Sequence, residues 1–448
     1  MATFTFIDLF AGLGGFHFAL NQLGGKCVFA SEIKSDLRKL YEINFPNTPI
    51  EGDITSITID NLPPHDILCA GFPCQPFSQA GKRQGFNDDK DRGNLFDYIC
   101  DIVKARRPRY IVLENVSNLK GHDEGRTWAT IRQKLQALNY EVADPVILSP
   151  HQFGVPQHRR RIYIVCENRE YGRLNGFTFP KPDNEICDIH SIIDETDKDY
   201  IPLKMETRKQ LEVWQEFLYN TKKYNGTIPG FPIWAMEFGA DYPIEKAPAY
   251  LSAEELRGRK GKLGKTIVGL DLDNCLEQLP VYAQTNKNEI FPKWKINYIM
   301  QNREFYKKNK FWLDKWLKKV EDFDNSHLKL EWNCGENANP IIEDKIVQFR
   351  ASGIRVKLPN YSPALNLVGT QIPIFPWVKL PDTISGNKKN QKGRYMTIRE
   401  AAKLQGMDNI SFGNDTFRLP QSRCFEALGN AVNVQVVCKI VSNLLHHE

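Results

Sequence analysis

The chain of 448 residues lacks three features that would place it in common protein classes. Its ten cysteines include no Cys-x-x-Cys pair and follow no regular spacing, which argues against a zinc site. No apolar run reaches the ~18 residues of a membrane-spanning helix, and the first residues lack the pattern of a secretory signal. We therefore expect no metal ion, no membrane partner and a reducing, cytoplasmic location.

Strong charge, internal repeats and low-complexity segments are absent as well. The formal net charge is only +5, but a local basic patch does not need to dominate the total, so a nucleic acid remains a candidate partner. A chain of this length usually forms about two to three domains. Within residues 185–390 prolines, aromatic residues and lysines increase and clear strand patterns disappear, which indicates a second domain inserted into the first.

The amino-terminal segment has the pattern of a strand followed by a ligand-binding turn. Residues 3–10 are rich in aromatic and β-branched types, and an amphipathic helix is expected after the turn. The turn contains Gly12, Gly14 and Gly15, which let a ligand approach the backbone. Their spacing differs from the GxGxxG fingerprint, which argues against a nicotinamide cofactor. Another nucleotide-like ligand and a plain tight turn both stay open.

Two acidic residues strengthen the ligand interpretation. Glu32 follows the next expected strand, residues 26–30, and Asp53 lies in the segment 51–54. An acid at the end of the second strand is well placed to bind ribose hydroxyls. A solvated surface carboxylate is the alternative for each.

Cys74 is the strongest candidate for a nucleophile. The apolar run Asp66–Ala70 is typical of a buried parallel strand, and Gly71–Pro73 ends it. Cys74 is thus expected at the carboxyl end of a strand, where ligands bind in open α/β sheets and a thiol of lowered pKa can react. By position alone it could equally be a small buried hydrophobic residue.

An acid and two arginines are expected at the same site. Glu114 directly follows the expected strand Tyr110–Leu113. Its apolar surroundings would favour the protonated acid, although Glu114 could instead cap the next turn. Arg159 and Arg161 precede the expected strand Ile162–Cys166. They share one face because side chains alternate along a strand.

Six segments resemble, in the same order, the motifs of the DNA cytosine-C5 methyltransferase family. They read FIDLFAGLGGF, GFPCQPFSQAG, ENV, QHRRRIYIV, RYMTIREAAKLQG and ALGNAVNVQVV. The resemblance is to the compact bacterial type found in restriction-modification systems. It implies an α/β fold with a doubly wound, Rossmann-like methyltransferase domain that uses S-adenosylmethionine. Residues 1–184 and 391–448 would form this domain, and a smaller target-recognition domain, residues 185–390, would be inserted into it.

The resemblance also implies the chemistry. Carbon 5 of cytosine is too electron-poor to attack a methyl sulfonium, so a nucleophile must first add at carbon 6. Cys74 would be that nucleophile and Glu114 the acid at N3, with Arg159 and Arg161 as further active-site groups. The base would have to swing out of the duplex to be reached.

The cofactor and DNA contacts follow by position. Phe10 would stack on adenine and Glu32 would hold the ribose, while Ile33 stands where family members often carry an aromatic residue. The expected cofactor residues are Phe10, Gly12, Gly14, Gly15, Glu32, Ile33, Asp53, Ile54, Pro73, Leu95, Asn430 and Val432. A lid, Gln79–Asn94, would bring Lys82, Arg83 and Arg92 to phosphates, unless it is an ordinary exposed loop. Arg350, Arg355, Lys357 and Thr370 are candidate DNA contacts of the recognition domain.

Two alternatives to a DNA enzyme keep the same fold. A tRNA methyltransferase of the related branch typically carries a Cys-Phe-Thr element, which this sequence lacks, since Cys424 and Phe425 are followed by Glu426. A catalytically silent DNA-binding relative would have lost Cys74 or Glu114, and both are present. We expect a monomer that acts on double-stranded DNA in a bacterial cytoplasm, and a cognate restriction endonuclease could share its recognition sequence.

Overall fold

The computed structural model describes residues 3–73, 95–183, 185–285, 288–365, 371–381 and 391–446. The chain forms two compact units. The first combines Met1–Asp194 with Asn360–Gly369 and Thr397–Glu448, and the second combines Glu195–Pro359 with Thr370–Met396. The chain therefore leaves the first unit twice and returns to it, and the short segment 360–369 groups with the first unit rather than with the residues around it.

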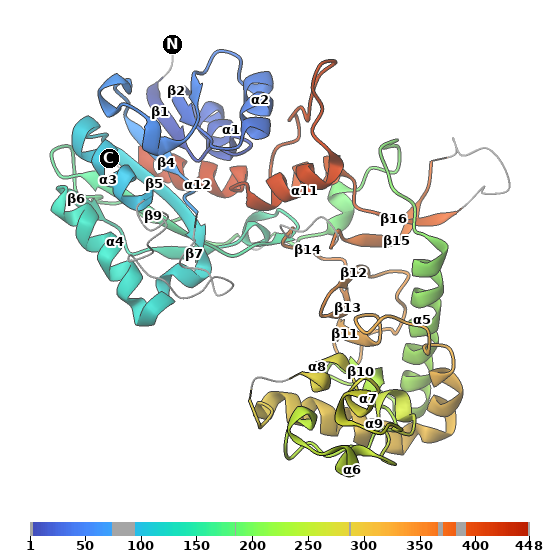
Figure 1. Ribbon diagram of the computed structural model, residues 1–448. Helices are drawn as coiled ribbons and strands as arrows, with labels where there is room; N and C mark the ends of the chain where they lie inside the picture. Colours follow the sequence, from blue (N-terminus) through green and yellow to red (C-terminus); the bar gives the residue numbers. More distant parts are fainter. Residues whose placement is uncertain are drawn as a thin grey trace. The chain divides into compact units, whose positions relative to one another are not determined.

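A mixed sheet lies at the centre of the first unit (Figure 1). Its strands are β1 (Phe4–Leu9), β2 (Gly25–Ser31), β3 (Ile50–Glu51), β4 (Ile67–Ala70), β5 (Tyr110–Val116), β6 (Tyr140–Val142), β7 (Val146–Leu148) and β9 (Arg161–Asn168). The order is β3-β2-β1-β4-β5-β9-β6, with β7 also paired to β9. The first five strands in this order, from β3 through β2, β1 and β4 to β5, pair in parallel, whereas β9 runs antiparallel to its neighbours. The predicted α/β class with a parallel sheet is confirmed.

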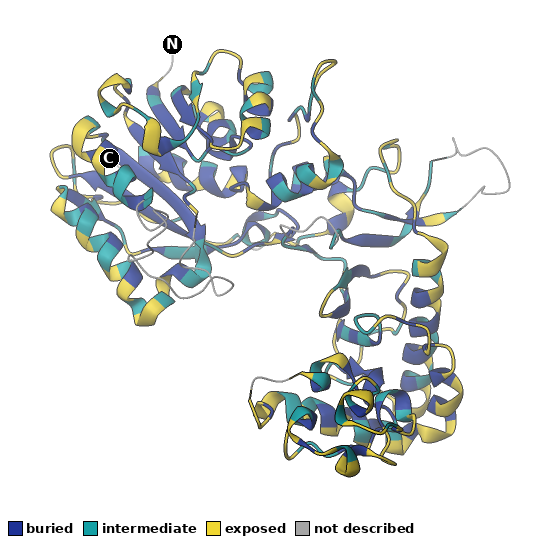
Figure 2. Cartoon of the chain, viewed as in Figure 1, coloured by how far each residue is buried: buried dark blue, intermediate teal, exposed yellow. Residues whose placement is uncertain are grey.

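Helices cover both faces of this sheet. Helices α3 (Leu95–Arg106) and α4 (Arg126–Ala137) share a buried cluster with Phe29 of β2, whereas α2 (Ser35–Asn44) packs against Ala30 on the opposite face. Because neighbouring side chains of a strand point to opposite faces, both faces of β2 are buried. Figure 2 shows the buried residues following the strands while the outer sides of α2 and α4 are exposed.

The last helices of the chain complete the first unit. They are α10 (Ile398–Leu404), α11 (Gln421–Asn430) and α12 (Val434–Leu445), and α12 packs against α1 (Gly15–Gln22). Asn433 caps α12, because its Oδ1 accepts a hydrogen bond from the backbone N–H of Val436 over 3.1 Å. A second pairing in this unit joins β8 (Gln157–His158) to β14 (Ser362–Pro363) in parallel. Segments far apart in sequence therefore build one unit.

The stretch Gln421–Leu445 is long and apolar enough to cross a membrane by length and composition. It comprises α11 and α12, and 72% of the apolar part is buried within the structure. Core helices of proteins that cross no membrane pass the same test, so this is weak evidence for a span.

Strand β5 is longer than the sequence predicts, which corrects the position of Glu114. The expected strand ends at Leu113, and parallel pairing with β4 does end there, at Ala70↔Leu113. Antiparallel pairing with β9 continues to Val116↔Arg161, because β9 begins beyond the edge of the parallel strands. Glu114 therefore lies within β5, one residue past the parallel edge, and its backbone is held by β9.

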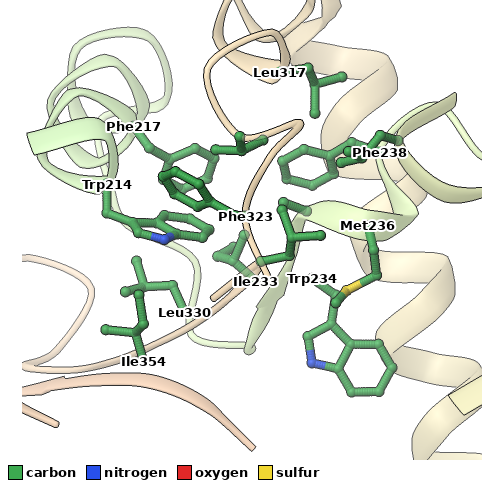
Figure 3. Close-up of a cluster of buried hydrophobic side chains, with 14 of the residues drawn as sticks. Trp214, Phe217, Ile233, Trp234, Met236, Phe238, Leu317, Phe323, Leu330 and Ile354 are labelled. Carbon is green, nitrogen blue, oxygen red and sulfur yellow. The ribbon is translucent and has the colours of Figure 1, made fainter. Parts of the chain in front are cut away.

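The second unit has its own sheet and core. Its strands are β10 (Ile233–Trp234), β11 (Lys329–Asn333), β12 (Ile346–Arg350), β13 (Gly353–Lys357), β15 (Ile374–Lys379) and β16 (Lys392–Tyr395), in the order β10-β11-β13-β12-β15-β16. Its helices are α5 (Met205–Asn225), α6 (Ala253–Leu256), α7 (Leu272–Leu276), α8 (Val281–Gln284) and α9 (Lys293–Leu317). Figure 3 shows Trp214 and Phe217 of α5 in one apolar cluster with Leu330 and Ile354 of the sheet. Trp312 and Trp316 of α9 are buried in the same cluster.

Candidate active site

The glycine turn after β1 is open at one residue and tightly packed at another. A Cβ atom placed on Gly12 would have no neighbour within 4 Å, whereas one on Gly15 would lie 2.5 Å from Cγ2 of Val432. Phe10 and Gly12 both have positive φ, 57° and 56°. For Phe10 this conformation costs of the order of 1–3 kcal/mol, which the surrounding structure must supply. The turn thus exposes its backbone at Gly12 and excludes any side chain at Gly15.

Glu32 is fixed from both carboxylate oxygens. It is buried, Oε2 accepts a hydrogen bond from the backbone N–H of Gly12 over 2.9 Å, and Oε1 accepts one from that of Lys34, also over 2.9 Å. Arg38 adds support, because its Nη1 donates to the carbonyl oxygens of Glu32 and Ile33 at 2.7 and 2.8 Å. The Ile33 side chain is 64% exposed. Sequence reasoning selected Glu32 and Ile33 but missed Arg38, because nothing local in the sequence marks its partners.

The other predicted cofactor residues follow the carboxyl ends of the parallel strands or the returning helices. Asp53 accepts a hydrogen bond from the backbone N–H of Thr55 over 2.9 Å, and the neighbouring Ile54 is buried. Leu95 begins α3 and packs against the core of the first unit. The remaining members are Gly14, with φ of 79°, exposed Pro73, exposed Asn430 at the end of α11, and buried Val432.

A charged network ties α11 to the loop that carries Glu32. Arg423 of α11 places Nε 2.7 Å from Oδ2 of Asp36, at the start of α2, and Nη1 2.6 Å from Oε1 of Glu426. Lys34 lies 3.5 Å from the same Glu426 oxygen. The contacts of Asp36 and Lys34 with α11 span almost the whole sequence, so sequence reasoning did not find them.

Glu114 is a buried acid beside a guanidinium. Its Oε1 lies 3.1 Å from Nε of Arg161, yet accepts no well-aligned hydrogen bond from a described residue. Burial raises the pKa of Glu114 above its ordinary value, and the charges of Arg161 and Arg159 oppose that rise. An acid with a raised pKa and an unfilled acceptor position can exchange a proton with a ligand placed there.

The loop that leads toward Cys74 passes next to Glu114. A Cβ atom on Gly71 would lie 3.5 Å from Cγ1 of Val432 and 3.9 Å from Oε2 of Glu114. Asn115 holds this loop, because its Nδ2 donates to the carbonyl oxygen of Phe72 over 3.1 Å. The sequence marks Asn115 only as a motif residue and does not reveal this anchoring.

Arg159 and Arg161 have different partners. Arg159 is buried and donates from Nη1 to the carbonyl oxygen of Gly429 over 2.6 Å and from Nη2 to that of Ala431 over 2.8 Å. Burial and the charge of Arg161 lower the pKa of Arg159 to about 9. Arg161 is the one that pairs with Glu114. The expected alternation holds, since Arg160 and His158 are exposed.

The model of the C-5 cytosine-specific DNA methylase family matches residues 4–446. The chain belongs to this family.

Individual members resemble the chain to different extents. The type II methyltransferase M.HpaII of Haemophilus parainfluenzae is 49% identical over 195 residues, which are 43% of this chain and 53% of that protein. The matched region thus spans about half the length of this relative. The type II methyltransferase M.AluI of Cellulosimicrobium cellulans is 29% identical, over 98% of this chain and 91% of that protein. The solved structure of Entamoeba histolytica methyltransferase EhMeth shares the fold, with a TM-score of 0.50, 15% identity and coverage of 99% of this chain and 98% of that chain.

Several residues predicted for this methylase lie outside the described residues. They are Cys74, Lys82, Arg83 and Arg92, together with the rest of the expected lid Gln79–Asn94, and Thr370. Among the residues that the structure does describe, no group of three or more His, Cys, Asp or Glu side chains could hold a metal ion.

The other predicted DNA contacts of the methylase lie on two strands of the second unit. Arg350 of β12 and Arg355 of β13 both approach Oε2 of Glu331, at 2.8 and 3.2 Å. Burial and the charge of Arg355 lower the pKa of Lys357 to about 8. The fold therefore brings these three cations together, and it adds Glu331, which sequence reasoning did not select.

Proposed function

We propose that this family member transfers a methyl group from S-adenosylmethionine to carbon 5 of a cytosine within a short sequence of double-stranded DNA. The observation that carries the proposal is the position of Glu114. This buried acid of raised pKa lies beside Arg161 and next to Gly71, which stands three positions before Cys74 in the GFPC motif. Membership of the methylase family supports the same substrate.

The nucleophile of the proposed reaction is Cys74. Its thiolate would add to carbon 6, and the electron pair of the 5,6 double bond would become available at carbon 5. After carbon 5 has taken the methyl group, it would lose its proton to a base and the thiolate would leave carbon 6, which restores the ring and the free enzyme. Asn115 would contribute by holding Phe72, two residues before Cys74.

Glu114 is proposed as the acid that protonates N3 while the thiolate adds. Its raised pKa keeps a proton available, and its Oε1 lacks a well-aligned partner among the described residues. Arg161 would orient the carboxyl group and compensate its charge once the proton has moved. Arg159 would act through the Gly429–Ala431 segment rather than on the base.

The residues at the parallel edge of the sheet fit S-adenosylmethionine. When bound, this group supplies the methyl group as a sulfonium. Glu32 is buried and oriented by two backbone N–H groups, as a carboxylate that binds a ribose must be, and Gly12 faces open space where a ligand can approach the backbone. Val432 would close the pocket, since it lies against both Gly15 and Gly71.

Separate roles for the two domains expected from the sequence are part of the proposal. Residues 1–184 and 391–448 would hold the cofactor and the reacting base, and residues 185–390 would recognise the DNA sequence. The base would be swung out of the duplex, at a cost of about a few kcal/mol, with Lys82, Arg83 and Arg92 on the lid holding phosphates. A role as the modification enzyme of a restriction-modification system, alongside an endonuclease of the same sequence specificity, would follow.

Methyl incorporation from labelled S-adenosylmethionine tests this function. Duplex DNA and tRNA serve as parallel substrates, with Cys74→Ser as the inactive control. We expect label in DNA as 5-methylcytosine at one short recurring sequence, and none with Cys74→Ser. Label in tRNA alone would replace the DNA substrate by tRNA. Bound cofactor with no transfer to either substrate would favour a silent DNA-binding relative.

A further inference from the structure

Three neighbouring strands of the second unit, β11, β13 and β12, have one polar, mainly basic face, on which Ile346 is the buried apolar exception. Parallel pairing sets Glu331 of β11 opposite Arg355 of β13, and antiparallel pairing sets Gln348 of β12 opposite the same Arg355. Since side chains alternate along each strand, the intervening residues point the other way. These are Leu330, Val347, Ile354 and Val356, all in the hydrophobic core. The face that bears the charges is therefore fixed by the core on its other side.

Cations outnumber anions on this face. Lys329, Arg350, Arg355 and Lys357 share it with the single carboxylate of Glu331 on these three strands. Lys329 is packed over the rings of Trp234 and Tyr282, with Nζ 4.9 and 5.4 Å from the ring centroids. The face keeps a surplus of positive charge after Glu331 is counted, which suits contact with a nucleic acid.

The two arginines approach Glu331 through different nitrogen atoms of their guanidinium groups. Arg355 approaches Oε2 through Nε, over 3.2 Å, with its side chain 32% exposed. Arg350 approaches the same oxygen through Nη2, over 2.8 Å, with its side chain only 11% exposed. The terminal end of Arg350 thus lies against Glu331, whereas Nη1 and Nη2 of Arg355 make no hydrogen bond or ion pair with any residue that the structure describes.

We infer that Glu331 is a positioning residue that holds Arg355 so that its terminal guanidinium nitrogens read a guanine in the DNA recognition sequence. The inference rests on the proposed function and names one base of the sequence that the enzyme selects. Two parallel N–H donors match the N7 and O6 acceptors that guanine presents in the major groove. Holding the guanidinium at Nε fixes the plane of that fork.

A fixed guanidinium suits base reading better than phosphate binding. A phosphate contact tolerates a mobile point charge such as a lysine, whereas bidentate contact with a base edge requires a defined plane and direction. Lys357, two residues from Arg355 on the same face, is placed to supply the phosphate contact. The largely buried Arg350 would hold the carboxylate of Glu331 in position.

The test is the base preference at each position around the methylated cytosine. Wild type, Arg355→Lys and Glu331→Gln are each given a pool of duplexes with random base pairs on both sides of one cytosine, at a fixed salt concentration. Sequencing of the methylated members gives the preference at every position. Glu216→Gln is the matched control, since it removes another carboxylate of the second unit that pairs with a cation, Lys319.

We expect both test variants to lose, at one G·C pair, a preference of roughly 5- to 150-fold, the range for one bidentate base contact. The other positions should keep theirs, and Glu216→Gln should match wild type. Unchanged preference at every position, or an equal loss at all positions, would overturn the inference. If Glu331→Gln does not fold, Glu331→Asp carries the test, because its shorter carboxylate cannot reach both arginines. A wild-type enzyme that methylates no DNA overturns the proposed function itself.

Discussion

The guanidinium of Arg159 donates to the carbonyl oxygen of Gly429 over 2.6 Å, across 270 positions of sequence. A second bond from the same group reaches Ala431. A buried arginine next to the proposed acid therefore holds the segment that precedes Val432, and one side chain links the proposed acid to a residue proposed for the cofactor site.

Replacing Arg159 should destabilise the protein and weaken cofactor binding together. Arg159→Gln removes two charge-assisted hydrogen bonds in a buried site, and we expect a loss of about 2–4 kcal/mol in the free energy of unfolding. Urea unfolding measures this loss. The adjacent, exposed Arg160→Gln is the control and should stay within about 0.5 kcal/mol of wild type. Equal stability of the two variants would contradict the anchoring role.

Glu114 should determine how the rate responds to alkaline pH. Burial raises its pKa, so the proton that it donates is present below this raised value and is lost as the pH rises through it. Single-turnover methylation should therefore fall on the alkaline side in wild type. Glu114→Gln should be slower by about 10² or more and should lack that alkaline fall. Glu141→Gln, at a half-buried carboxylate of β6 that pairs with Arg169, serves as control. A near-normal rate in Glu114→Gln would remove the acid from the mechanism.

The pair Asp36–Arg423 should support cofactor affinity from outside the pocket. Asp36→Asn and Arg423→Gln should each weaken binding of S-adenosylmethionine roughly two- to fivefold, as expected for half-exposed ion pairs. The double variant should be no weaker than Arg423→Gln alone, because that change already removes the contact with Asp36. Calorimetry without DNA gives the dissociation constants. Arg132→Gln, which breaks a surface pair with Asp144, is the control, and additive losses would argue against coupling.

His17 should make stability depend on pH in the acidic range. It is buried, its Nδ1 lies 2.7 Å from the hydroxyl of Tyr41, and its ring stacks on Phe45. Burial lowers the pKa of His17 to about 4, below the value of about 6.5 in the unfolded chain. The unfolded state thus binds the proton more readily, and stability is lost as the pH falls from about 6.5 to 4.

Urea unfolding at pH 7.5 and pH 5 measures this effect. Between these two pH values the free energy of unfolding of wild type should fall by about 2 kcal/mol more than that of His17→Phe, since the variant has no proton to bind at that position. All other titrating groups are common to both proteins and cancel in the difference. The same loss in both proteins would show that His17 does not titrate on unfolding.

The sequence predicted the parts of the fold that depend on local pattern. The strand before the glycine turn and the buried run ending at Ala70 both have sequence patterns that reflect burial. The predicted end of β5 at Leu113 was wrong. Pairing with β9 extends that strand, and no local sequence pattern indicates a partner about fifty residues away. Glu331 and Arg423 were missed for the same reason, since their partners lie on other elements.

The contact between Gly15 and Val432 has a consequence for the time at which the protein matures. Val432 is synthesised roughly 20 to 80 s after Gly15 at the usual rate of about 5–20 residues per second. During that interval the nascent chain carries the first wall of the proposed pocket without the residue that closes it. A nascent chain that stops before Val432 would thus lack the residue proposed to close the pocket, and the proposed activity would arise only once α11 and α12 have folded back onto the first strands.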